Sequence, residues 1–135
     1  MKKILFISLL NLLAMFASAQ IKLLDLSVIP VNEPSSDSIT VWVQFKARNI
    51  ADIQTVQLNF ETQNGMADVL QKTATVTQQA NTYYTQFENQ STPIENYNIS
   101  LYCKMTKEQF ALYNIARVVV QYNDNSSAFL VLNND

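Results

Sequence analysis

The chain has 135 residues, of which 48% are hydrophobic, and it contains one cysteine, one glycine and no histidine at a formal net charge of −2. Without histidine, serine and cysteine nucleophiles lack their usual activating base, and zinc or haem sites lack their commonest ligand. The single glycine, Gly65, excludes a glycine-rich phosphate-binding loop, and the acidic balance argues against nucleic acid as a partner.

The first 19 residues have the pattern of a cleaved signal peptide. Two lysines precede an apolar run over residues 4–14 that is too short to span a bilayer, and Ala17 and Ala19 supply the small side chains of a cleavage site. We expect a mature domain over residues 20–135, which keeps seven of the nine basic residues and all eleven acidic ones, a net charge of −4. The sequence therefore predicts a periplasmic or secreted protein with no membrane insertion after signal cleavage.

The mature chain begins with alternations of period two, which are typical of β-strands with one buried face. Leu24, Leu26 and Val28 form the predicted inner face of a first strand that ends at Pro30, and a polar loop follows. The next strand, over residues 39–48, has the clearest alternation in the chain. Its predicted inner face consists of Ile39, Val41, Val43, Phe45 and Ala47.

Further strands are predicted over residues 56–61, 66–76, 81–87 and 97–105. Asn64 and Gly65 join the first two of these, because this dipeptide suits the positive φ angles of a tight hairpin. Residues 91–93 are expected to interrupt the chain as a break. Cys103 alternates with Leu101 and Met105, so we predict a buried, unreactive thiol.

A short helix is predicted over residues 107–113. Thr106 and Gln109 have the spacing of a capping box, in which each side chain bonds to the backbone N–H of the other residue. The chain then closes with a hairpin whose arms lie near residues 116–122 and 129–132. Seven or eight short strands in one domain of about 100 residues favour an all-β, two-sheet sandwich over a barrel.

In strand number and spacing, residues 20–135 resemble the immunoglobulin-like or fibronectin-like β-sandwiches found in small exported bacterial proteins. The resemblance implies that the second and fifth strands are neighbours in one sheet. Trp42 and Tyr84 would then lie together, while Tyr102 would lie on the other sheet.

These three aromatic residues are the candidate binding residues. Trp42 is the only tryptophan, and the pleat directs it away from the inner face of its strand, among Thr40 and Gln44. Tyr84 and Tyr102 share this outward placement. Flat rings beside amide side chains suit a protein interface or a sugar-stacking platform. The alternative is that a loop, the terminal segment or the short helix covers Trp42, which then fills a second small cluster.

Other candidate sites are weaker. Ser38, between Asp37 and Ile39, matches an acceptor pattern of bacterial O-glycosylation. Glu61 and Asp68 flank the predicted hairpin as a carboxylate pair, for which we favour solvated surface charges. We therefore predict no catalytic residue, no metal site and no cofactor.

The sequence predicts an exported, non-enzymatic β-sandwich that binds an envelope or extracellular protein. A carbohydrate-binding module that uses Trp42 and Tyr84 is one alternative, with a glycan as the partner. A structural subunit that polymerises through its edge strands is another, and the apolar run over residues 129–132 would then be the joining strand.

Overall fold

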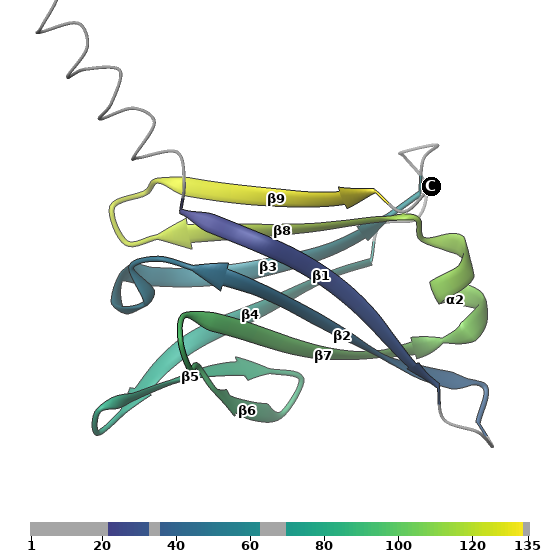
Figure 1. Ribbon diagram of the computed structural model, residues 1–135, viewed down its shortest axis with the longest axis horizontal. Coiled ribbons are helices and arrows are strands. Elements are labelled where there is room, and N and C mark those ends of the chain that lie inside the picture. Colours follow the sequence, from purple (N-terminus) through teal and green to yellow (C-terminus); the bar gives the residue numbers. More distant parts are fainter. Residues whose placement is uncertain (1–21, 33–35, 63–69, 134–135) are drawn as a thin grey trace, which may run out of the picture.

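The computed structural model describes residues 22–32, 36–62 and 70–133. The chain forms two antiparallel sheets packed face to face, with one short helix at one end (Figure 1). The predicted all-β sandwich is therefore confirmed. The predicted cleavage site and the Asn64-Gly65 turn lie outside the described residues.

The small sheet has the order β1-β2-β7. Its strands are β1 (Leu23–Asn32), β2 (Ser38–Ala47) and β7 (Asn98–Thr106). The large sheet has the order β6-β5-β4-β3-β8-β9. Its strands are β3 (Ile53–Glu61), β4 (Leu70–Gln79), β5 (Thr82–Phe87), β6 (Gln90–Pro93), β8 (Ile115–Tyr122) and β9 (Ser127–Asn133). A 3₁₀ turn, η1 (Ile50–Asp52), leads from β2 into β3.

This strand order corresponds to that of an immunoglobulin-like sandwich, in which strands A, B and E share one sheet and strands C, F and G share the other. Here β1, β2 and β7 correspond to strands A, B and E, and β3, β8 and β9 correspond to strands C, F and G. The strands β4, β5 and β6 extend the large sheet beyond β3. The strand paired with β2 is therefore seventh in the chain, not fifth.

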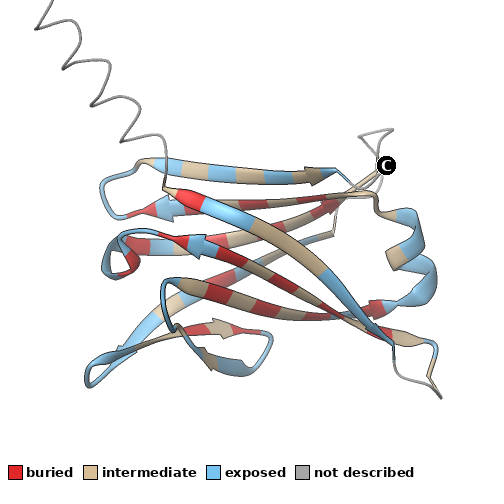
Figure 2. Ribbon diagram, viewed as in Figure 1, coloured by how far each residue is buried: buried red, intermediate tan, exposed pale blue. Residues whose placement is uncertain are grey.

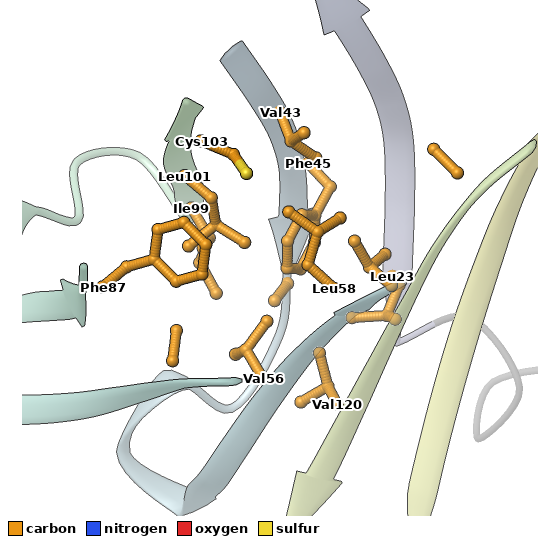
Figure 3. Packing of buried hydrophobic residues seen from close by; sticks show 14 of the residues in the cluster. Leu23, Val43, Phe45, Val56, Leu58, Phe87, Ile99, Leu101, Cys103 and Val120 are labelled. Atoms are coloured by element: carbon orange, nitrogen blue, oxygen red, sulfur yellow. The ribbon is translucent and has the colours of Figure 1, made fainter. Parts of the chain in front are cut away.

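The core lies between the sheets, where inward side chains of β2, β3, β7 and β8 meet. Buried and partly exposed residues alternate along these four strands (Figure 2). Figure 3 shows Phe45 of β2, Leu58 of β3 and Val120 of β8 pointing into the same space. The predicted inner face of β2 is confirmed, because each of its five members is at most 4% exposed.

Cys103 belongs to this core and is fully buried, as predicted. Burial raises the pKa of its thiol to about 11, and the nearby Glu88 carboxylate acts in the same direction while Lys72 opposes it. A thiol in this state is a poor nucleophile, because the thiolate is the reactive form.

The first strand differs from its prediction. Asp25 has a positive φ of 58°, and the pairing register with β2 shifts between Leu24 and Ser27. Such a bulge moves one residue of the strand out of the alternation. As a result Leu23 is buried and Leu24 is exposed, and the strand continues beyond Pro30. The prediction that Leu24 faces inward is therefore wrong.

The strand count of seven or eight is also too low, because the described residues contain nine strands. The additional strand is β6, which lies where a break was expected. Glu88 and Asn89 both have positive φ and connect β5 to β6 as a two-residue hairpin turn. Pro93 is tolerated because β6 is the edge of the large sheet.

The helix α2 (Lys107–Leu112) follows β7 directly and leads to β8 in the other sheet. Its capping box is present in full, since Gln109 N donates to Thr106 Oγ1 and Thr106 N donates to Gln109 Oε1, both at 3.0 Å. Phe110 and Tyr113 pack against the core from this link. The predicted helix is confirmed, with Tyr113 as its C-cap.

Candidate functional site

The outer face of the small sheet carries one apolar row across its three strands. Ile29 of β1 pairs with Trp42 of β2, and Trp42 pairs with Tyr102 of β7. Directly paired residues on one face have neighbouring side chains. The register between the strands therefore aligns these three large side chains.

The two aromatic rings of the row stack on each other. The ring centroids of Trp42 and Tyr102 are 5.8 Å apart, and the ring planes differ by 16°. Both residues are partly buried. The indole Nε1 is buried and has no hydrogen-bond partner among the described residues. The orientation of Trp42 therefore rests on ring packing and not on a hydrogen bond.

The row is bordered by one further apolar residue, Val31 of β1, and otherwise by polar residues. Ile29 and Val31 are 43% and 48% exposed, which is high for large aliphatic side chains. The pairing Val31–Thr40–Lys104 flanks the row on one side. On its other side stand Ser27, Gln44 and Ser100. An apolar centre with a polar rim is the usual anatomy of a protein interface.

Tyr84 is not part of this surface. It lies on β5 of the large sheet, where it pairs with Thr77 and Pro93. The prediction that Trp42 lies beside Tyr84 and apart from Tyr102 is wrong, because the strand that pairs with β2 is β7. The alternation correctly indicated which side chains point outward, but it held no information on which strands are neighbours.

Ser38 is the first residue of β2 and is partly exposed, and its backbone N–H donates to Ser36 Oγ at 3.1 Å. Its place at the junction of loop and strand matches the prediction, and its O-glycosylation stays a prediction.

The candidate carboxylate pair is not assembled in the described residues. Glu61 Oε2 accepts from Arg117 Nη2 at 3.3 Å across β3 and β8, and Asp68 lies outside the described residues. In the β8–β9 turn, hydrogen bonds from Ser126 hold the pKa of the Asp124 carboxyl below its usual value. Across the described part of the chain, no three His, Cys, Asp or Glu residues are grouped to hold a metal ion.

The exposed apolar residues Ile29, Val31 and Tyr97 were not identified as candidates from the sequence. Val31 was placed in a loop and Ile29 was given no role, because the first strand was expected to end at Pro30, whereas β1 continues to Asn32. Tyr97 was treated as the beginning of an ordinary strand, but it lies in a turn and is 66% exposed. The dipeptide Asn96-Tyr97 was the available signal, because asparagine favours turns.

Comparison of the chain with family models, with curated proteins and with solved structures finds no match. Over the described ranges, none of the helices is both long and apolar enough to cross a membrane.

Proposed function

We propose that this chain is an exported binding protein whose binding surface is the outer face of the small sheet. The surface consists of Ile29, Val31, Trp42 and Tyr102, and the proposed partner is another protein of the envelope or the extracellular space. The observation that carries the proposal is the row Ile29–Trp42–Tyr102 on a face that the fold does not need to fill. Export is inferred from the signal-peptide pattern.

The ring geometry favours a protein partner over a glycan. A sugar-binding platform offers the flat face of an aromatic ring to the apolar side of a sugar. Here Trp42 and Tyr102 turn one face toward each other at 5.8 Å, and Ile29 is the cross-strand neighbour of Trp42 on the other side. The Trp42 ring is thus flanked by Tyr102 and Ile29, and ring edges and aliphatic carbons are available to a partner, where they pack well against protein side chains.

The test compares four purified forms of the mature chain, residues 20–135: the wild type, Ile29→Asp, Tyr102→Thr and Tyr84→Thr. Ile29→Asp places a charge in the centre of the surface at an exposed position of an edge strand, so we expect the protein to fold. Tyr84→Thr removes an outward aromatic residue from the large sheet and serves as the matched control. Each form is immobilised and incubated with envelope and extracellular fractions from the cells that make the protein.

The proposal expects a protein that the wild type and Tyr84→Thr retain and that Ile29→Asp loses. Tyr102→Thr should lose the same protein, because it removes half of the stacked pair. Equal retention by all forms would contradict the proposal. Retention that disappears after enzymatic removal of polysaccharide, but not after protease treatment, would favour the glycan-binding alternative.

A second candidate function is assembly through β9, which is the edge of the large sheet. The strand contains no charge and no proline, which are the residues that usually protect an edge. Its outward residues Phe129 and Val131 are 62% and 44% exposed. A subunit that assembles in this way should change its size with concentration, and light scattering over a dilution series would detect this. Phe129→Lys should abolish the change, and a monomer at all concentrations would exclude assembly.

A further inference from the structure

The turn between β6 and β7 contains an unusual residue. Asn98 N donates to Glu95 O at 3.0 Å, and the two residues between them, Asn96 and Tyr97, have φ angles of 53° and 65°. A two-residue turn with two positive φ angles prefers Asn-Gly, because glycine has no Cβ to clash in this conformation. Tyrosine therefore stands where glycine would be more favourable.

Burial does not offset this unfavourable backbone conformation. The Tyr97 side chain is 66% exposed, the highest value among the large hydrophobic residues described. Its backbone is nevertheless held in place, because Ala47 N donates to Tyr97 O at 3.0 Å. An exposed aromatic residue held in an unfavourable backbone conformation indicates selection for something other than folding.

Tyr97 stands between two clefts at one end of the sandwich, where the β2–β3, β6–β7 and β8–β9 links and the start of β1 come together (Figure 1). The first cleft has a volume of about 460 Å³, and Lys22, Lys46 and Arg48 line it together with Leu24. The second has a volume of about 600 Å³, and its polar lining includes Asn49, Asp52 and Asn96. Tyr97 and Asn49 line both clefts.

The first cleft is cationic in a chain whose net charge is −2. Lys46 has a carboxylate nearby, since its Nζ lies 3.8 Å from Asp25 Oδ2 in an exposed pair. Lys22 is positioned by a hydrogen bond to Ser126 Oγ at 3.1 Å and by the ring of Tyr122, whose centroid is 4.7 Å from Nζ. Asp52 lines the second cleft, and together with Lys22 and Asp124 it also lines a third cleft. The cationic cleft therefore suits a carboxylate, and the second cleft suits hydroxyl groups.

We propose that this end of the sandwich binds an acidic polysaccharide built of uronic acid residues. One sugar ring stacks on Tyr97 and directs its carboxylate to Lys22 and Arg48, and hydroxyls of the adjoining sugar bond to Asn49 and Asn96. A polysaccharide fits better than an acidic peptide, because both clefts are open and the second offers the amide groups of Asn49 and Asn96 beside apolar residues such as Ile50 and Ile94.

The test uses polygalacturonate oligosaccharides and titration calorimetry on the mature chain. We expect binding that weakens as NaCl is raised and is lost with the methyl-esterified oligosaccharide, which has no carboxylates. Arg48→Gln should weaken binding at least tenfold. Lys104→Gln is the matched control, because it removes an exposed cation from the outer face of the small sheet and should leave binding unchanged.

Tyr97→Gly gives the sharpest result, because its two effects have opposite signs. The fold should become more stable, with a rise in Tm of about 4 °C, since glycine relieves the positive φ. Binding should fall at least tenfold, since the ring is lost. If Tyr97 had a purely structural role, its replacement would change stability and binding in the same direction.

Three outcomes would overturn the proposal. Unchanged binding by Tyr97→Gly would remove the stacking role, and equal binding of the methyl ester would remove the carboxylate. Competition by polyglutamate at equal carboxylate concentration would identify a site for acidic peptides. The variants Ile29→Asp and Tyr102→Thr should bind polygalacturonate normally, so failure of the protein-interface proposal and failure of this one are distinguishable.

Discussion

The outer face of the small sheet presents the row Ile29–Trp42–Tyr102, whereas the corresponding row of the large sheet reads Phe129, Val119, Gln57 and Thr73. In this row of the large sheet, apolar side chains are limited to β8 and β9 at one edge. The inner faces of both sheets, by contrast, are largely apolar, with Thr85 and Lys72 as polar members in the large sheet. The large sheet also carries outward aromatic residues, Phe129 and Tyr84, but among the described residues only the outer face of the small sheet has a stacked aromatic pair, Trp42 and Tyr102.

The largest expected effect separates the two faces of β2. Phe45→Ala should lower the free energy of unfolding by about 3–5 kcal/mol, because Phe45 is fully buried between the sheets. Trp42→Ala removes a larger side chain, but from a partly exposed position, and should cost less than about 2 kcal/mol. Urea denaturation measures both. Equal losses of unfolding free energy would mean that Trp42 stabilises the fold as much as Phe45 does. The contrast between the two faces of β2 would then be wrong.

The next effect concerns how completely water is excluded from the inner face of the small sheet. Burial raises the pKa of the Cys103 thiol from 9.0 to about 11. The unfolded thiol ionises first as the pH rises, so this contribution to stability is fully present below pH 9 and is lost between about pH 9 and pH 11. The loss should be about 2–3 kcal/mol.

Cys103→Ala provides the reference, because other groups also titrate in this range. The unfolding free energy of the wild type should fall more steeply between pH 9 and pH 11 than that of Cys103→Ala. Parallel curves would mean that solvent reaches the thiol and that the small sheet is less tightly packed on the large one than the structure shows.

A smaller effect tests the link that joins the two sheets. Thr106→Ala removes the hydroxyl that accepts from Gln109 N at the start of α2, and it should cost about 1 kcal/mol. Thr73→Ala, on the polar outer face of β4, is the control and should cost less than about 0.5 kcal/mol. Equal costs would show that the capping box does not stabilise the connection from β7 to β8.

The smallest effect is expected on the outer face of the large sheet. Glu61→Gln removes the charge that pairs with Arg117 at 3.3 Å, and the cost should lie between about 0 and 1 kcal/mol because both side chains are partly exposed. The cost should decrease in high salt. A loss of several kcal/mol would indicate that this face, too, contains a specific structural network.

Local patterns in the sequence were sufficient to predict the elements that depend only on residues nearby in the chain. The alternation of β2 predicted its inner face residue by residue, and Thr106 with Gln109 predicted the beginning of α2, because both depend only on neighbours along the chain. The position of Cys103 followed from the same alternation. The outward direction of Trp42, Tyr84 and Tyr102 was also predictable from the pleat.

The tertiary structure decided which of these residues meet. A period of two assigns a side chain to one of two faces, but long-range pairing selects the neighbouring strand, and here the inserted β5–β6 hairpin made β7 the partner of β2. The bulge at Asp25 depends on the pairing of β1 with β2, and it brings Ile29 rather than Val28 opposite Trp42. The sequence thus determined an all-β sandwich with outward aromatic residues. Only the packing of distant strands determined that Trp42 stacks on Tyr102 and that Tyr97 stands between two clefts.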